Sequence, residues 1–401
     1  MTGSLAPGEA ILTLNAGSSS LKFALYRVAG GAEPLMLIRH GQIDGIGVAP
    51  HLRISDPEGG ILAETRWPAD LAHDYDHLLD DLLAKLDAQL NGRRLGAIGH
   101  RVVHGGAQFH APVLIDESVI DILTALVPLA PLHQPHNLKP IAALRRLRPD
   151  TPQIACFDTA FHHTLPAVAT WLPLPRRFRQ EGIRRYGFHG LSYEYIARKL
   201  NQEAPHLARG RVVVAHLGNG ASLCALDQGH SIDTTMGMTA VDGLMMGTRT
   251  GSIDPGVLLY LMQPQGMSPV AIEDLLYRQS GLLGVSEISS DMRSLLASKD
   301  SRAAEAIALF VYRAAHEIAG LGASLGGIDG IVFTAGIGEH APEIREGVIA
   351  RLSWLGASLD LAANRRNDTI ISSPTSAIEI RVMPTDEEAM IAQHCLEALG
   401  Q

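Results

Sequence analysis

The sequence contains one short pattern twice, and this repeat limits the fold more than any other feature. Residues 11–26 (ILTLNAGSSSLKFALY) join an apolar run to an alternating apolar and polar run through a turn of small residues. Alternation with a period of two is typical of a half-buried strand, so the segment predicts strand, turn and strand. Residues 212–226 (VVVAHLGNGASLCAL) repeat that order. Two such hairpins in a chain of 401 residues predict a duplicated domain facing itself across a cleft.

Both turns are built of residues whose backbone N–H groups and hydroxyls can approach an anion closely. Lys22 adds a cation just after the first turn. The segment is not a Walker loop, because it lacks the GxxxxGK[ST] spacing and no helical period follows it. The residues alone leave two interpretations open, a phosphate-binding hairpin and an ordinary polar turn at a sheet edge.

The first part of the chain alternates strand and helix patterns. We expect a helix over 74–90, a strand over 97–103, a helix from Asn137 as N-cap to about residue 148, and a strand over 153–157. This alternation predicts an α/β fold.

The second part continues the alternation. We expect a short helix capped by Ser192, a long apolar-striped helix over 301–325, and a strand over 330–333 that meets a third glycine-rich turn, 335–339, before a helix over 342–355. A last strand, 378–383, precedes an acidic segment that opens the terminal helix.

Composition excludes several classes of protein. The net charge is −9 and no block of Lys or Arg is long, so a nucleic-acid partner is not expected. Three scattered cysteines without a CxxC pair indicate a reducing compartment. No signal-like start and no apolar run of about 18 residues occurs, so we expect a cytoplasmic protein without a membrane partner.

Two arginines stand out as candidates for binding anions. Arg249 lies in a segment rich in Gly and Met, 236–255, where a guanidinium could clamp a phosphoryl group; a solvated loop arginine is the alternative. Arg101 lies within an otherwise apolar strand. A charge there must either pair with an opposite charge or serve in function, and we favour a functional role.

Histidines number 18, so each one is a weak signal, and no His or Cys set has metal-ligand spacing. His189 differs because two glycines flank Phe188 and His189 and leave both side chains free to face a cleft. For magnesium the candidates are oxygen ligands: Asn15, Asp158 and Glu387. Helix capping is the alternative for Glu387.

A family resemblance rests on nine motifs that occur in this order along the chain: NAGSSSLK, GHRVVHGG, APLHQPHN, FDTAFHHTLP, RRYGFHG, HLGNGAS, GLMMGTRTGSIDP, FTAGIGEH and PTDEE. Over nearly the whole chain the sequence resembles the acetate kinase family. The resemblance implies two duplicated ribonuclease-H-like α/β domains of the sugar kinase/actin type, flanking a nucleotide cleft. The implied domains are 1–158 with 387–401, and 159–386. It also implies ATP/ADP as co-substrate, Mg²⁺ (or Mn²⁺) as cofactor and a homodimer.

The resemblance also implies roles for individual residues. Asn15 and Glu387 would bind the metal, Arg101 the carboxylate substrate, and Asp158, His189 and Arg249 would be catalytic. Val103, Leu132 and Phe188 would surround the methyl group. The implied nucleotide-binding set is Lys22, His216, Leu217, Gly218, Asn219, Gly220, Asp291, Met292, Arg293, Gly336, Ile337, Gly338, Glu339 and His340.

The implied reaction is direct in-line transfer of the ATP γ-phosphoryl group to acetate, giving acetyl phosphate. A carboxylate with a pKa of about 4.3 is ionised at neutral pH and needs no base, so the obstacle is repulsion between two anions. We therefore expect Asp158 to orient magnesium or an arginine rather than to move a proton. One alternative is a kinase for propionate or butyrate, which a residue smaller than valine at position 103 would favour. The other is a non-catalytic ATP-binding module, which would not need the cation of Arg101.

The sequence departs from the family pattern at four places. His340 stands where Asn is usual, His136 where a second Pro is usual, residues 191–193 (Leu-Ser-Tyr) where Thr-Ser-His is usual, and residues 240–242 (Ala-Val-Asp) where Pro-Leu-Glu is usual. None of these four departures falls on one of the six residues implied to bind the metal, bind the carboxylate or act in catalysis.

Overall fold

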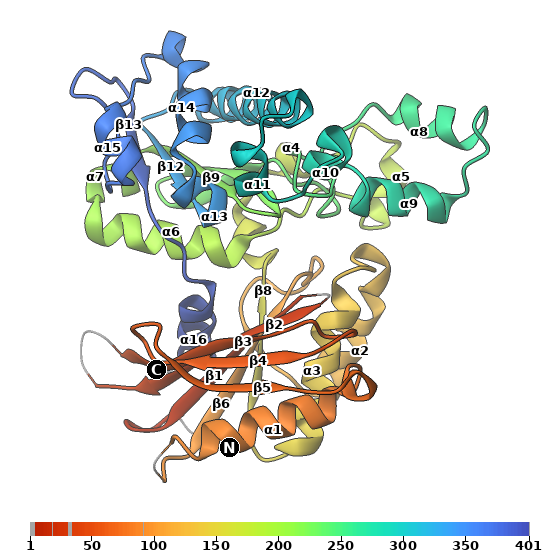
Figure 1. The fold of residues 1–401 in the computed structure, drawn as a ribbon, viewed down its shortest axis with the longest axis vertical. Helices are drawn as coiled ribbons and strands as arrows, with labels where there is room; N and C mark the ends of the chain where they lie inside the picture. The colour runs from red at the N-terminus through yellow and green to blue at the C-terminus, as the bar shows by residue number, and fades with distance from the viewer. Residues whose placement is uncertain (1–4, 18, 31–33, 91, 401) are drawn as a thin grey trace. The chain divides into compact units, whose positions relative to one another are not determined.

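A computed structural model describes residues 5–17, 19–30, 34–90 and 92–400. The chain forms two compact units (Figure 1): the first comprises Met1–Phe161 and Asp386–Gln401, and the second His162–Thr385. Each unit contains one mixed sheet with helices on both faces.

The first unit is built on an eight-stranded sheet in the order β5-β4-β3-β2-β1-β6-β8-β7. β1 pairs antiparallel with β2 and parallel with β6, and β6 pairs parallel with β8. The strands are β1 (Ala10–Ala16), β2 (Ser20–Val28), β3 (Leu35–Asp44), β4 (His51–Ser55), β5 (Ile61–Arg66), β6 (Leu95–Val102), β7 (Val113–Leu114) and β8 (Gln153–Phe157).

The second unit has a five-stranded sheet in the order β11-β10-β9-β12-β13. Its strands are β9 (Arg211–Leu217), β10 (Ala221–Asp227), β11 (His230–Thr234), β12 (Gly330–Thr334) and β13 (Glu379–Val382). The order and the strand directions match those of β3-β2-β1-β6-β8: two antiparallel pairings are followed by two parallel ones. The predicted duplicated α/β fold is confirmed.

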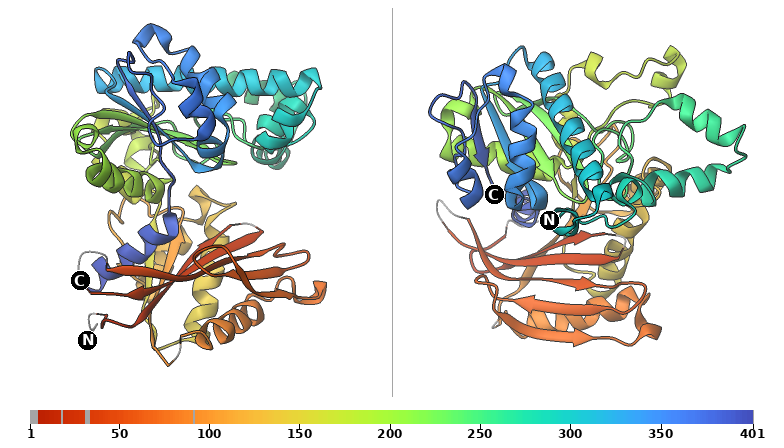
Figure 2. Two further views of the ribbon diagram at one scale, coloured as in Figure 1. Left: turned by 60° about the vertical axis from the view of Figure 1, so that its left-hand side comes forward. Right: turned by 45° about the horizontal axis from the view of Figure 1, so that its top comes forward.

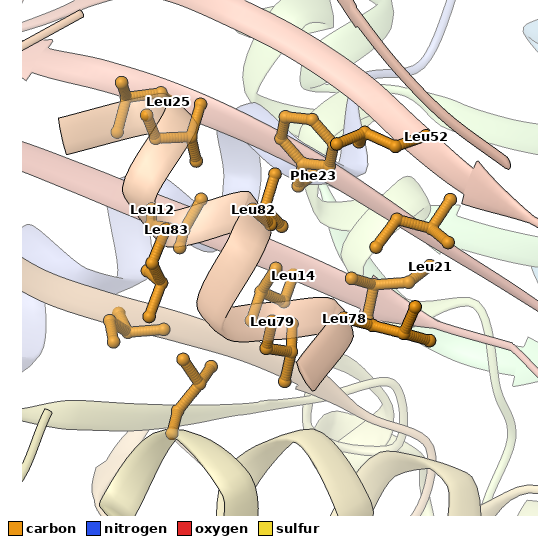
Figure 3. Packing of buried hydrophobic residues seen from close by; sticks show 14 of the residues in the cluster. Leu12, Leu14, Leu21, Phe23, Leu25, Leu52, Leu78, Leu79, Leu82 and Leu83 are labelled. Carbon is orange, nitrogen blue, oxygen red and sulfur yellow. The ribbon is translucent and has the colours of Figure 1, made fainter. Parts of the chain in front are cut away.

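Leucines of α1 (Tyr75–Asp87) fill the core beside the first sheet (Figure 3). The helix presents Leu78, Leu79, Leu82 and Leu83 on one face, as the sequence spacing of three and four predicts. They pack against the inner side chains of β1, β2 and β4, which include Leu12, Leu14, Leu21, Phe23, Leu25 and Leu52.

Two further helices hold the central strands of the first sheet from opposite faces. α3 (Gln134–Leu147) packs on β1 and β6, and α16 (Glu387–Ala398) packs on β1, β6 and β8. A Cβ at Gly99 in β6 would lie 2.5 Å from Ile391 Cγ2 and 2.6 Å from Cys395 Sγ, so only glycine allows α16 to lie this close.

In the second unit α12 (Ser301–Leu325) covers one face of the sheet, and α6 (Gly190–Glu203) lies on the other (Figures 1 and 2). α13 (Ala335–His340) and α14 (Pro342–Ala350) follow β12. The remaining α-helices are α2 (Glu117–Ala125), α4 (Ala167–Thr170), α5 (Arg176–Gln180), α7 (Pro205–Ala208), α8 (Pro255–Met262), α9 (Pro269–Arg278), α10 (Gly281–Ser286), α11 (Met292–Ala297) and α15 (Leu361–Arg366). Among the described residues, no helix combines the length and apolar character needed to cross a membrane.

Two predicted helix caps are wrong. α3 begins three residues before Asn137, with His133 as its N-cap, and α6 begins at Gly190 with His189 as its N-cap. The side chains of Asn137 and Ser192 instead make tertiary hydrogen bonds, which compete with capping for the same polar atoms.

The end of β12 also differs from the prediction. The third glycine-rich turn is the short helix α13, and the helix that follows it ends at Ala350 rather than near residue 355.

Candidate active-site residues in the two units

Four predicted site residues of the first unit form one hydrogen-bonded group. Asn15 lies near the end of β1, Arg101 lies in β6, Asp158 follows β8, and Glu387 begins α16. The three strands are parallel neighbours, so their carboxyl ends meet at one edge of the sheet, where open α/β sheets bind ligands.

Arg101 is the centre of this group. Its Nε donates to both oxygens of Asp158 (3.0 and 3.1 Å), its Nη2 donates to Asp158 Oδ2 (2.6 Å), and its Nη1 donates to Asn15 Oδ1 (3.0 Å). Burial alone would lower the pKa of Arg101, but the charges of Asp158 and Glu387 outweigh it and raise that pKa, so the guanidinium stays charged. A guanidinium has five N–H groups, so these contacts with described residues leave one N–H on each terminal nitrogen for a ligand.

Asn15 also links the arginine to two acidic residues. Its Nδ2 donates to Glu387 Oε2 (3.0 Å) and to Glu388 Oε1 (3.3 Å). Burial and the neighbouring Glu387 charge raise the pKa of Glu388, an effect that Lys22 partly offsets. Magnesium is commonly bound by one or two carboxylates together with water and phosphate oxygens. The carboxylate of Glu387 is a ligand of this kind, whereas Asn15 Oδ1 accepts a hydrogen bond from Arg101 in this structure.

The described residues contain no group of three or more His, Cys, Asp and Glu side chains arranged around a metal position. Lys22 stands directly opposite Asn15 in the β1–β2 register, with its side chain exposed. The cation and the amide therefore lie at the same end of the hairpin.

Val103, predicted to contact the substrate methyl group, is held by a buried amide. Asn137 Oδ1 accepts the Val103 N–H (2.9 Å), and Asn137 Nδ2 donates to the Ala16 carbonyl (2.9 Å). One side chain thus fixes both the end of β1 and the segment after β6. Leu132 is half-buried just before α3.

In the second unit His189 and Arg249 lie together beside Gly220. A Cβ at Gly220 would lie 2.7 Å from Arg249 Nη2 and 3.3 Å from His189 Nε2. Gly220 belongs to the turn between β9 and β10, residues 218–220, which we call the Gly220 turn. Two side chains predicted to act on phosphate, those of His189 and Arg249, therefore lie next to the Gly220 turn, which was itself predicted to bind phosphate.

His189 adopts a left-handed backbone conformation, with φ 58° and ψ 25°. Such a conformation is uncommon for a residue other than glycine and is found preferentially at functional sites. Its Nδ1 lies 2.8 Å from Ser222 Oγ, and its ring stacks on that of His216 with centroids 4.2 Å apart. Phe188 is buried immediately before it.

The Arg249 segment packs tightly on the Gly220 turn. Gly247 N–H donates to the Asn219 carbonyl (3.0 Å), and a Cβ at Gly247 would lie 1.9 Å from Asn219 Oδ1. The same Cβ would lie 3.2 Å from the Ser290 carbonyl, and residues 291–293 follow directly after Ser290 in the chain. In that stretch Asp291 binds its own neighbour Arg293 (2.7 Å), while the side chain of Met292 is buried.

The predicted nucleotide segment 336–340 forms α13. Gly336 and His340 are exposed, whereas Gly338 and Leu217 are buried. Glu339 Oε1 accepts hydrogen bonds from the backbone N–H groups of Ala335 (2.8 Å) and Thr385 (3.3 Å). Its carboxylate therefore links the start of α13 to the segment before α16.

Arg345, which the sequence analysis did not identify, binds the carboxyl end of α13. It is fully buried and donates to the carbonyls of Gly338 (2.8 Å) and Glu339 (2.9 Å) and to Asn364 Oδ1 (2.8 Å). Burial lowers the pKa of Arg345 to about 10. A cation at the carboxyl end of a short helix satisfies carbonyls that have no partner within the helix.

Known proteins resemble this chain over almost its full length. A family model described as "Acetokinase family" matches residues 10–393. An acetate kinase of Rhodopseudomonas palustris is 54% identical over 389 residues, covering 96% of this chain and 97% of that protein.

Two solved structures are similar over almost the full length. A propionate kinase from Francisella tularensis has a TM-score of 0.88 at 37% identity, covering 96% of this chain and 98% of its own. The acetate kinase of Porphyromonas gingivalis has a TM-score of 0.86 at 35% identity, covering 98% of this chain and 100% of its own. The chain belongs to the acetokinase family.

Proposed function

We propose that this protein is an acetate kinase, which transfers the γ-phosphoryl group of ATP to acetate and gives acetyl phosphate and ADP. The observation that carries the proposal is Arg101: a charged guanidinium at the carboxyl edge of the first sheet, with two N–H groups left over from its contacts with described residues. The N–H groups of a guanidinium form strong charge-assisted hydrogen bonds with a carboxylate.

The two units would divide the work. The first, assigned as 1–158 with 387–401, would hold acetate and magnesium, and the second, assigned as 159–386, would hold ATP. Glu387 and Asn15 would bind the magnesium ion, which when bound helps to neutralise phosphate charge. A homodimer and a cytoplasmic location belong to the same proposal.

Each polar group then has a role in overcoming the repulsion between two anions. Arg101 would bind and orient acetate, and Asp158 would hold Arg101 in place. His189 Nε2 and Arg249 Nη2, both beside Gly220, would donate to the oxygens of the transferred phosphoryl group. No proton has to leave acetate, so positioning and charge stabilisation carry the reaction.

A propionate kinase is the second candidate, because the Francisella structure with a TM-score of 0.88 bears that name. The two candidates differ by one methylene, which a pocket distinguishes by only about 1–3 kcal/mol. The side chain of Val103 favours the smaller acid.

The test is to trap acyl phosphate with hydroxylamine in reactions that contain ATP, magnesium and one acid: acetate, propionate or butyrate. We expect the highest kcat/KM with acetate and no product when magnesium is chelated. Preference for propionate would select the second candidate. ATP turnover that no carboxylate alters would overturn the proposal in favour of an ATP-binding module.

A further inference from the structure

Two buried side chains, Tyr193 and Ser222, form a hydrogen-bonded relay behind His189. Tyr193 in α6 and Ser222 in β10 are both fully buried, and their hydroxyl oxygens lie 2.5 Å apart. Ser222 Oγ lies 2.8 Å from His189 Nδ1. The relay therefore runs from the helix, through the strand, to the ring nitrogen that faces away from Gly220.

The hydrogen-bonding capacity of these groups sets the tautomer of His189. Burial raises the pKa of Tyr193 well above its ordinary value, so the phenol keeps its proton. A phenol is a stronger donor than an aliphatic hydroxyl, so Tyr193 donates to Ser222, and the single Ser222 proton is then directed to His189 Nδ1. A neutral imidazole that accepts at Nδ1 carries its proton on Nε2, beside Gly220 and Arg249.

The neighbouring residues fix the rings but do not replace this relay. The His216 ring stacks on His189, with centroids 4.2 Å apart, and is held by its own partner, Ser192 (2.8 Å). Two imidazolium rings at this distance would repel each other, so the stacking disfavours a state in which both rings are charged. The Tyr193 ring packs edge-on against His162 and His216, with centroids 5.7 and 6.4 Å away, so a phenylalanine would keep these contacts.

We propose that Tyr193 is a positioning residue: through Ser222 it holds His189 as the tautomer whose Nε2–H points at the Gly220 turn. The proposal rests on the proposed function only for its kinetic consequence, because the tautomer itself can be observed without turnover.

The first experiment is nitrogen NMR of protein labelled at histidine, which distinguishes protonated from unprotonated ring nitrogens. In the wild type we expect the His189 signals, assigned with His189→Ala, to have the proton on Nε2. Tyr193→Phe and Ser222→Ala should each give a mixture of tautomers. An unchanged His189 tautomer in Tyr193→Phe would overturn the proposal, whatever the enzyme's substrate.

The second experiment is a double-mutant cycle on acetyl phosphate formation. Tyr193→Phe should lower kcat roughly tenfold, equivalent to about 1.4 kcal/mol, with little change in either KM. The same substitution in a His189→Ala background should have no further effect, because the relay acts only through that ring. Equal losses in both backgrounds would mean a purely structural role and would overturn the proposal.

Tyr75→Phe is the matched control. It removes a buried phenol oxygen of the first unit that has no hydrogen-bond partner among the described residues. We expect wild-type kcat and an unchanged His189 tautomer in this variant. Thermal unfolding of Tyr193→Phe within a few degrees of the wild type would verify that the ring still packs.

Discussion

Asp158 accepts three hydrogen bonds from the guanidinium of Arg101, the shortest of them 2.6 Å long. The side chain of Asp158 is only 2% exposed, and that of Arg101 18%. A carboxylate paired in this way is an orienting group, because it fixes the plane of the guanidinium. Together with the bond to Asn15, it leaves one N–H on each terminal nitrogen of Arg101.

Replacing this carboxylate tests whether orientation is its role. Asp158→Asn removes the charge that holds Arg101, and breaking a buried ion pair is costly. We expect kcat/KM for acetate to fall about 100-fold, equivalent to about 2.7 kcal/mol, together with an altered magnesium dependence. Asp87→Asn, which breaks an exposed pair with Arg148, is the control and should have wild-type kinetics. An Asp158→Asn enzyme with most of its rate and unchanged magnesium dependence would contradict this role.

The size of residue 103 should set the preference between acids. Val103→Ala removes two methyl groups from a side chain whose backbone Asn137 fixes, so the space remains open. We expect the ratio of kcat/KM for propionate to that for acetate to rise about tenfold. Val102→Ala changes the neighbouring core residue and should destabilise the protein without altering that ratio. A ratio that moves equally in both variants would exclude a specific contact.

Gly220 leaves room for the two groups beside it. Gly220→Ala would place a methyl group 2.7 Å from Arg249 Nη2 and 3.3 Å from His189 Nε2, so at least one of them must move. We expect kcat to fall about 100-fold, because misplaced transition-state donors lose most of their effect. Gly320→Ala, where the methyl group would meet nothing within 4 Å, should keep full activity. Normal kcat in Gly220→Ala would show that this contact is irrelevant.

Arg345 should stabilise the second unit and its α13 segment together. Arg345→Met leaves several buried carbonyl and amide oxygens without donors, which we expect to cost roughly 3–5 kcal/mol of unfolding free energy. KM for ATP should rise more than KM for acetate. Urea titration and steady-state kinetics measure both effects. Arg365→Met, at an exposed position of α15, should change neither, and similar losses in both variants would refute the assignment.

Two buried histidines should make the first unit sensitive to acid. Burial lowers the pKa of His100 and of His104 to about 4, from 6.5. Below pH 6.5 the unfolded chain binds these protons and the folded chain does not, so stability falls as the pH falls from about 6.5 towards 4. At pH 5 each residue should cost about 2 kcal/mol.

His100→Gln keeps an amide donor for Gln153 and removes one titrating group. The loss of unfolding free energy between pH 7 and pH 5, measured in urea, should therefore shrink by about 2 kcal/mol. His77→Gln, at an exposed position of α1, should retain the wild-type loss. An identical pH dependence in wild type and His100→Gln would contradict the assignment.

Local patterns in the sequence were enough to predict most elements. The two hairpins, the leucine face of α1 and the bounds of α12 follow from periods of two or 3.6 residues, and the structure has them. The segment 236–254, which is rich in glycine and methionine, contains neither helix nor strand. These features depend on neighbours in the sequence, which the sequence displays directly.

Tertiary partners could not be predicted in the same way. Asn137 and Ser192 looked like caps because both are good capping residues, but a distant N–H or imidazole uses each side chain. Arg345, Glu388 and Ser222 gave no local signal, since a buried arginine, a second glutamate in an acidic turn and a serine in a strand are recognised only by what surrounds them. The sequence led us to expect that Asp158 orients magnesium or an arginine, but it did not identify Arg101 as the partner.

The helix that begins at Glu387 has a consequence for how the protein is made. α16 is twelve residues long and covers β1, β6 and β8, yet it is encoded at the far end of the chain. Synthesis proceeds from the amino terminus, so the first sheet must leave the ribosome with one apolar face uncovered, while every residue of the second unit, 162–385, has already been added before α16. The sheet of the first unit therefore remains without α16 until the last part of the chain has been made, and a stop codon just before Glu387 would leave that face of the sheet uncovered.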